Sequence, residues 1–297
     1  MVAISGGYHG CHGVLAIYQK LTSCTIVDLH DESTWGDLGK GDLVHMETPL
    51  NPSGEAFEIA KYAERAHKKG ARLSVDATFA PPPLQDPFAC GADFVMHSGT
   101  KYFGGHSDML CGVVAIGKRN ADWETDYWGM YKERLFLGSV MGSLEGWLGV
   151  RSMRTLELRV MRQSQSTEGI VKWLHEILTE GKGEEAEVVK SVVSKLQHAS
   201  LQKEDMGWLR KQMPGGFGPV FSIWMKDENM ARRLPSRLHL FHHATSLGGV
   251  ESLIEWRRMS DDTVDPRVLR VSVGVENIED LKVDLMDAFR ALAKESN

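Results

Sequence analysis

Short apolar runs that alternate with a helical pattern dominate the first 117 residues of the chain. The apolar runs are rich in Val, Ile and Leu, as strands are. Between two of them, Glu55–Lys69 has Ala and Ile at helical spacing and stops at Gly70. Strands alternating with helices predict a parallel, doubly wound α/β sheet. The expected strands are Val2–Ser5, Cys24–Leu29, Asp42–Met46, Leu73–Asp76, Phe94–His97 and Met109–Ile116.

The second half of the chain has a different pattern. Leu144–Leu178 has a long helical periodicity and is expected to connect two domains, while Glu180–Glu187 is a solvated loop or the start of a helix. Two short strands, Val220–Met225 and Leu269–Val273, and a last helix over Asp280–Lys294 favour a smaller α+β domain. We therefore expect a large domain over residues 1–150 and a C-terminal small domain over residues 151–297.

The segment Ser98–Asp108, SGTKYFGGHSD, places Lys101 between two expected strands with a hydroxyl on each side. Asp76 ends another expected strand upstream. Each residue alone is most simply a solvated loop lysine or a turn aspartate. Together they match the lysine that forms a Schiff base and the aspartate that pairs with a pyridinium nitrogen in pyridoxal-phosphate proteins. Asp76, Lys101 and Asn51 also fall at or just past strand ends, where ligands bind in doubly wound sheets.

Several separated segments carry a resemblance to one family. Ser74–Val114 contains the lysine motif, Gly6–Val14 reads GGYHGCHGV, Met46–Gly54 reads METPLNPSG, Thr245–Leu253 reads TSLGGVESL and Leu269–Leu281 reads LRVSVGVENIEDL. In this order they closely resemble the trans-sulfuration (Cys/Met metabolism) enzymes that use pyridoxal phosphate, and most of all the cystathionine γ-synthases and γ-lyases. The resemblance implies a fold-type I pyridoxal-phosphate enzyme.

The resemblance implies roles at the cofactor. Lys101 would bind pyridoxal 5'-phosphate covalently and shuttle protons, and Asp76 would keep the pyridine nitrogen protonated. Tyr8 would stack on the ring and, with Lys101, would be catalytic. Ser98 and Thr100 would supply phosphate hydroxyls. The expected cofactor-binding residues are Tyr8, Asn51, Asp76, Thr78, Ser98, Thr100 and Lys101.

The same resemblance implies an amino-acid site. Arg270, inside an apolar strand, would clamp the substrate α-carboxylate, because its planar guanidinium can donate two parallel hydrogen bonds. Ser246 would orient the lysine, and Asn51 would bind the phenolic oxygen of the cofactor and border the substrate. The simpler alternatives are a snorkelling arginine for Arg270 and an Asn-Pro turn for Asn51.

Departures from the family pattern bear on the reaction. Thr245 stands where cystathionine-processing members carry a glutamate. Gly248–Ser252 is similar to the γ-synthase and γ-lyase versions of this segment. Glu255–Pro266 replaces a His-Pro-Ala-x-Met-Thr-His stretch of the family, so Trp256–Arg258 fall where substrate enters. We expect γ-replacement on an activated homoserine ester. The alternatives are cystathionine γ- or β-lyase-type elimination, and a non-catalytic truncated remnant that binds a full-length paralogue.

Only seven residues precede Tyr8, whereas the family has roughly a hundred there, a domain-sized difference. The resemblance therefore implies an N-terminally truncated chain that lacks a phosphate-binding helix N-terminus. It also implies a homo-oligomer, dimer or tetramer, that retains its cofactor weakly.

Bulk properties limit the partners. The formal net charge of −6 argues against nucleic acid and anionic membranes, and no apolar stretch approaches the ~20 residues of a membrane span. Four cysteines without paired spacing indicate a reduced, cytoplasmic protein. The twelve histidines show no zinc spacing, so no metal is expected.

Overall fold

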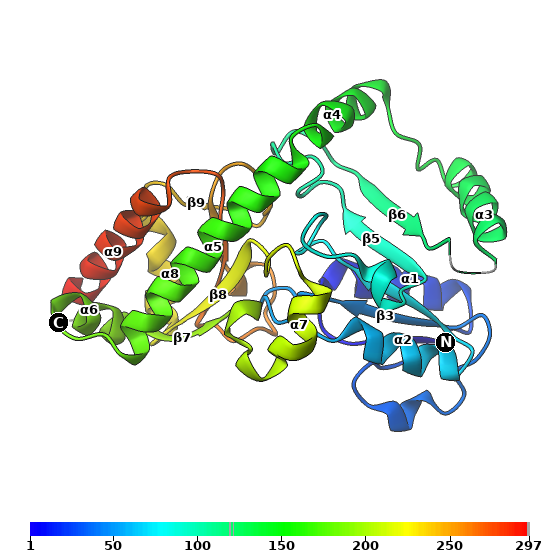
Figure 1. Ribbon diagram of the computed structural model, residues 1–297, viewed down its shortest axis with the longest axis horizontal. Helices are drawn as coiled ribbons and strands as arrows, with labels where there is room; N and C mark the ends of the chain where they lie inside the picture. The colour runs from blue at the N-terminus through cyan, green and yellow to red at the C-terminus, as the bar shows by residue number, and fades with distance from the viewer. Residues whose placement is uncertain (119, 121, 296–297) are drawn as a thin grey trace.

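A six-stranded sheet forms the first half of the molecule (Figure 1). The computed structural model describes residues 1–118, 120 and 122–295. The strand order is β2-β1-β3-β4-β5-β6, with every pair parallel except β5 and β6. The strands are β1 (Val2–Ile4), β2 (Ile26–Asp28), β3 (Leu43–Glu47), β4 (Arg72–Asp76), β5 (Phe94–Ser98) and β6 (Gly112–Ile116). The predicted strands and the mostly parallel sheet are confirmed, with small shifts at the strand ends.

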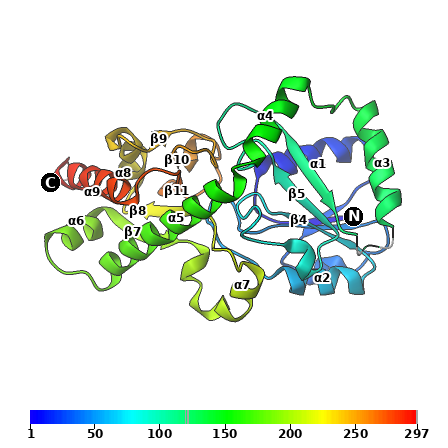
Figure 2. The ribbon, with the colours of Figure 1, turned by 45° about the horizontal axis from the view of Figure 1, so that its top comes forward.

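Helices α1 (His9–Leu21) and α2 (Ile59–Lys68) lie on opposite sides of this sheet (Figure 2). α2 packs its apolar stripe, including Ile59 and Ala66, against buried Val44 and Leu73 of the central strands. The strand order reverses between β1 and β3, which are neighbours in the sheet but lie on either side of β2 in the chain. Such a reversal opens a crevice at the carboxyl edge of a doubly wound sheet.

A second sheet organises the other half, in the order β7-β8-β11-β10-β9. The predicted strands correspond to β8 and β11, whereas β7, β9 and β10 were not predicted. The strands are β7 (Val193–Gln197), β8 (Val220–Met225), β9 (His242–His243), β10 (Leu253–Trp256) and β11 (Val268–Ser272). The helices nearby are α5 (Leu156–Thr179), α6 (Glu184–Val192), α7 (Met206–Gln212), α8 (Glu228–Arg233) and α9 (Ile278–Glu295).

One hydrophobic core lies between this second sheet and the helices α5, α6 and α9, and includes the fully buried Phe221, Val271 and Phe289. α9 contains the predicted last helix. α6 begins at Glu184, inside the segment that was predicted to be a loop or a helix start. Fold class is thus as expected: a mostly parallel α/β sheet, followed by a smaller sheet with helices.

The predicted helical pattern over Leu144–Leu178 is divided into α4 (Ser143–Met153) and α5, and α3 (Trp123–Phe136) precedes both. At the division Arg159 donates from Nη2 to the carbonyl of Ser152 and from Nη1 to that of Tyr102, at 2.9 and 2.8 Å. The guanidinium thus satisfies one carbonyl at the end of α4 and ties it to the lysine segment. The proposed domain boundary at residue 150 lies within α4 and stays a prediction. Among the described helices, none has the length and apolar character needed to span a bilayer.

Candidate active site

A cavity of about 990 Å³ lies at the carboxyl edge of the first sheet, where residues from both halves of the chain meet. Glu47, Asp76 and Ser98 come from the last residues of β3, β4 and β5, and Arg270 comes from β11. All the residues that the sequence predicted for the site line this cavity: Tyr8, Asn51, Asp76, Thr78, Ser98, Thr100, Lys101, Ser246 and Arg270.

Lys101 follows β5 and points its amine at Ser246, with Nζ 3.0 Å from Oγ. Burial lowers the pKa of Lys101, and the charge of Arg270 acts in the same direction, while Glu255 opposes it. A lowered pKa increases the neutral, nucleophilic fraction of the amine. Gly248 allows the close approach of the two segments: its φ is +81°, and a Cβ there would lie 3.0 Å from the Cβ of Lys101.

Asp76 ends β4 with its carboxylate buried. Its Oδ1 accepts hydrogen bonds from the backbone N and Oγ1 of Thr78, at 2.9 and 2.6 Å. Burial raises the pKa of Asp76, and the two bonds from Thr78 lower it; no cation among the described residues appears beside these causes. A buried carboxylate without a cationic partner fits a protonated ring nitrogen, which would supply the missing charge.

The hydroxyls of Thr78 and Thr100, two of the predicted cofactor-binding residues, differ in their surroundings. Thr78 Oγ1 also accepts from the backbone N of Ser98, at 2.8 Å, so this hydroxyl positions the start of the lysine segment. The Thr100 hydroxyl accepts from the Cys111 backbone N at 3.1 Å and lies 3.4 Å from the Cys111 carbonyl. Since the second contact is long, the Thr100 proton can be redirected to a phosphate oxygen at small cost.

Arg270 is 3% exposed and reaches the two segments predicted to border the substrate. Its Nη1 donates to Asn51 Oδ1 at 3.1 Å, and its Nη2 donates to the carbonyls of Thr245 and Ser246, at 2.5 and 3.1 Å. Burial lowers the pKa of Arg270 to about 10, which still leaves the group charged at neutral pH. A fixed guanidinium beside the lysine amine suits a carboxylate ligand.

Three charged residues of the cavity were not predicted as site residues: Glu47, Glu255 and Arg257. Glu47 accepts from the backbone N of Tyr8 and of Asn51, both at 2.7 Å, so its carboxyl group holds two predicted site residues together. Burial, and then the charge of Asp76, raises the pKa of Glu47 to about 8. For Glu47 the sequence did contain a signal, because a charged residue at the end of an apolar strand marks the edge of the sheet where ligands bind.

Tyr8 is the residue immediately before α1 and is 49% exposed, with its ring 4.7 Å from that of His9. It lines the cavity at its mouth. An aromatic face at this place can cover a ring that is held between Asp76 and Lys101.

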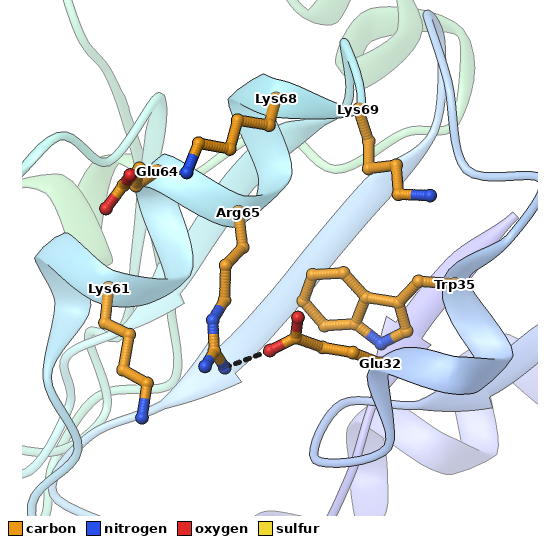
Figure 3. A pocket seen from close by; sticks show the side chains of 7 residues that line it. All are labelled: Glu32, Trp35, Lys61, Glu64, Arg65, Lys68 and Lys69. Atoms are coloured by element: carbon orange, nitrogen blue, oxygen red, sulfur yellow. Dashed lines mark ion pairs between the residues drawn. The ribbon is translucent and has the colours of Figure 1, made fainter.

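A smaller hollow of about 410 Å³ lies beside α2 and contains none of the predicted site residues (Figure 3). Arg65 pairs with Glu32 across it at 2.5 Å, and Lys68 pairs with Glu64 at 2.6 Å. Two of the four cations that line this hollow, Arg65 and Lys68, therefore already have acidic partners.

A partly buried lysine amine, a buried aspartate and a fixed arginine around one cavity form the kind of site that binds an aldehyde cofactor and an amino acid. The family model of the Cys/Met metabolism PLP-dependent enzymes matches residues 1–290, and the chain belongs to this family. Its members are pyridoxal-phosphate-dependent enzymes of sulfur amino-acid metabolism, in the cystathionine synthase and lyase group.

Similar proteins carry different reaction names. The chain is 31% identical to a cystathionine β-lyase of Lactococcus lactis subsp. cremoris, with 97% of this chain and 81% of that protein covered. It is 35% identical to the cystathionine γ-synthase of Escherichia coli, with 86% and 64% covered. The crystal structure of apo CalE6, a methionine γ-lyase from Micromonospora echinospora, matches with a TM-score of 0.82 at 31% identity, over 97% of this chain and 74% of that one.

Proposed function

We propose that this enzyme carries out γ-replacement on an activated homoserine ester, in the manner of a cystathionine γ-synthase. The observation that carries the proposal is the Lys101–Ser246 contact beside the Arg270–Asn51 contact in one cavity. An amino acid held by its carboxylate at Arg270 would present its α- and β-carbons to the lysine amine.

The proposed roles of the residues follow from their surroundings. Asp76 holds a proton on the ring nitrogen of the cofactor, Ser98 and Thr100 bind its phosphate, and Tyr8 covers the ring. Asn51 borders both cofactor and substrate. When bound, pyridoxal phosphate supplies an electron sink for the substrate α-carbon.

Lys101 performs the proton transfers. Its neutral amine takes the proton from the α-carbon and would pass it to the bound cofactor, so that the amine is neutral again when it takes a proton from the β-carbon. Ser246 keeps the amine directed at the substrate. The Cγ–O bond of the ester then breaks, and the carboxylic acid leaves as its anion with the bonding electron pair. A cysteine sulfur forms the new C–S bond at Cγ, its thiol proton passes to solvent, and Lys101 returns protons to the β- and α-carbons. Arg270 holds the α-carboxylate throughout.

The loop of residues 248–252 supports γ- over β-chemistry. Its sequence is similar to the γ-synthase and γ-lyase versions, and Gly248 packs directly against Lys101. The alternative, elimination from cystathionine or a related amino acid, is supported by the β-lyase and γ-lyase names among the relatives.

Incubation of the cofactor-loaded chain with an O-acyl-homoserine, with and without cysteine, separates these reactions. A thioether that forms only with cysteine supports replacement. A ketoacid and ammonia released without cysteine support elimination. A chain that binds pyridoxal phosphate and yields neither product would support the non-catalytic alternative, in which it binds a full-length paralogue.

We also propose that the chain works as a homo-oligomer. α1 buries none of its residues and exposes Val14, Ile17 and Leu21 by 60% or more. Exposed apolar side chains on one helix are typical of contact surfaces. Light scattering after size-exclusion chromatography tests this: a dimer or tetramer supports the proposal, and a strictly monomeric chain contradicts it.

A further inference from the structure

Two buried arginines share one buried glutamate at the wall of the active-site cavity. Glu255 in β10 lies opposite Arg270 in β11, and the two form an ion pair at 2.5 Å. The same carboxylate accepts from Arg257 Nη1 at 3.0 and 3.1 Å. The three side chains are only 2–5% exposed. These three side chains together carry one more positive than negative charge, which the partly exposed Asp261, 3.9 Å from Arg257, balances in part.

Arg257 still has donors that lack an acceptor. Its Nε is buried and has no hydrogen-bond partner among the described residues. Its Nη2 lies 3.9 Å from Oδ2 of Asp261, an ion-pair distance that is too long for a hydrogen bond. Oδ1 of that aspartate already accepts two hydrogen bonds from Thr263. A buried N–H without a partner is unfavourable, so a ligand that supplied an acceptor here would be stabilised.

The free donors of Arg257 suit a carboxylate. Nε and Nη2 lie on one edge of the planar guanidinium, and the two oxygens of a carboxylate can accept from both. Arg257 lines the same cavity as Lys101 and Arg270. Its position is separate from the donors of Arg270 that are proposed to hold the α-carboxylate.

We propose that Arg257 is a specificity-determining residue that binds a second carboxylate, carried on the side chain of the amino-acid substrate. This inference rests on the proposed function for the position of the α-carboxylate at Arg270. It narrows the substrate class to amino acids with an anionic group at the far end of the side chain. An ester whose acyl group ends in a carboxylate belongs to this class, and one with a neutral acyl group does not.

The test compares ligands and variants that differ in one charge. Isothermal titration calorimetry of the cofactor-loaded protein measures Kd for L-2-aminoadipate and for L-norleucine, whose chain ends in a methyl group instead. L-Glutamate and L-norvaline form a shorter pair of the same design. We expect the wild type to bind the better of the two dicarboxylates at least about tenfold more tightly than its neutral counterpart.

Arg257→Gln is expected to reduce this preference about tenfold or more, with little change in the Kd of the neutral ligands. Arg258→Gln is the matched control, because it removes the same charge from the exposed next residue. Arg257→Lys keeps the charge without the planar fork and should give an intermediate preference. Circular dichroism shows whether each variant is folded.

Two results would overturn the inference. One is a wild-type protein without any preference for the dicarboxylates. The other is a folded Arg257→Gln or Arg257→Lys protein in which both members of a pair lose affinity equally, which indicates a purely structural role. Because the readout is equilibrium binding, it does not depend on whether γ-replacement occurs: a preference that disappears in Arg257→Gln supports the inference even where the thioether assay fails.

Discussion

The Lys101 amine and the Ser246 hydroxyl lie 3.0 Å apart, although 145 residues separate them in the chain. The contact joins the lysine segment after β5 to the loop before β10, and so connects the two halves of the molecule. Arg270 donates to the carbonyl of the same Ser246, so the proposed proton-transferring group and the proposed carboxylate-binding group share one anchor.

Replacement of Ser246 by Ala should slow the reaction more than it weakens substrate binding. The variant removes one hydrogen bond to Lys101 Nζ, which is worth about 1 kcal/mol, so kcat is expected to fall about threefold to tenfold. Steady-state kinetics measure this. Ser236→Ala, which removes a hydroxyl far from the cavity, is the control. An unchanged kcat in Ser246→Ala would show that this contact does not direct the amine.

Arg270→Lys should raise KM for the amino acid while leaving the charge in place. Lysine cannot replace the planar fork that contacts Asn51 and the α-carboxylate, and charge-assisted hydrogen bonds are worth about 1.5–3 kcal/mol. We expect KM to rise about tenfold to a hundredfold. The thermal midpoint is measured in parallel, because Arg270 also pairs with buried Glu255. A KM equal to that of the wild type would show that Arg270 does not bind the substrate.

The raised pKa of Glu47 predicts that the free energy of unfolding falls between pH 6.5 and 8. Its folded pKa, about 8, lies above the ordinary value of 4.5. As the pH rises, the folded chain therefore keeps the Glu47 proton to a higher pH than the unfolded chain does. The stability that this provides is lost as the pH rises through 8. His45, His97 and His198 have pKa values lowered by burial to about 4. Their contribution has the opposite sign and is complete only about one pH unit above the ordinary histidine value, so it offsets part of the Glu47 effect, equally in the wild type and in Glu47→Gln.

Urea unfolding of the cofactor-free chain at pH 6.5 and pH 8 measures this effect. The wild type should lose stability over this interval, and Glu47→Gln should lose less, since glutamine does not titrate. Glu204→Gln, at an exposed position, should behave as the wild type. If Glu47→Gln and the wild type respond equally to pH, Glu47 is ionised normally in the folded chain.

Gly248→Ala should destabilise the site. A methyl group there would lie 3.0 Å from the Lys101 Cβ and 3.1 Å from the Tyr102 backbone N, and the φ of +81° is unfavourable for alanine. We expect a loss of about 1–3 kcal/mol in unfolding free energy, together with weaker cofactor binding. In Gly207→Ala the new methyl group meets nothing within 4 Å. This control should unfold at or above the wild-type midpoint, and a similar loss in both variants would contradict the packing argument.

The sequence was informative where one motif determines both local structure and chemistry. The strand end at Asp76 was predicted, and the end of β5 at Ser98 was predicted one residue early, at His97, because apolar runs stop there. All predicted site residues line one cavity. Their roles stay predictions. The short strand β9 was not predictable, since its two exposed histidines pair only because β10 lies alongside.

The cluster of Glu255, Arg257 and Arg270 shows a different limit. The sequence placed Arg257 in a segment where substrate was expected to enter, but it gave no sign that Glu255 is buried. Only the antiparallel pairing of β10 with β11 brings that glutamate to Arg270. The division between α4 and α5 has a similar origin, because the contacts of Arg159 with Ser152 and Tyr102 are set by tertiary packing and not by helical periodicity.

Attachment of the cofactor to Lys101 is the central claim and can be tested directly. The purified chain is saturated with pyridoxal phosphate, reduced with borohydride, digested and mapped by mass spectrometry, with Lys101→Ala treated in the same way. The account predicts one modified peptide, which contains Lys101 and is lost in the variant. A wild-type chain without a modified peptide, or with the label on another lysine, would contradict it.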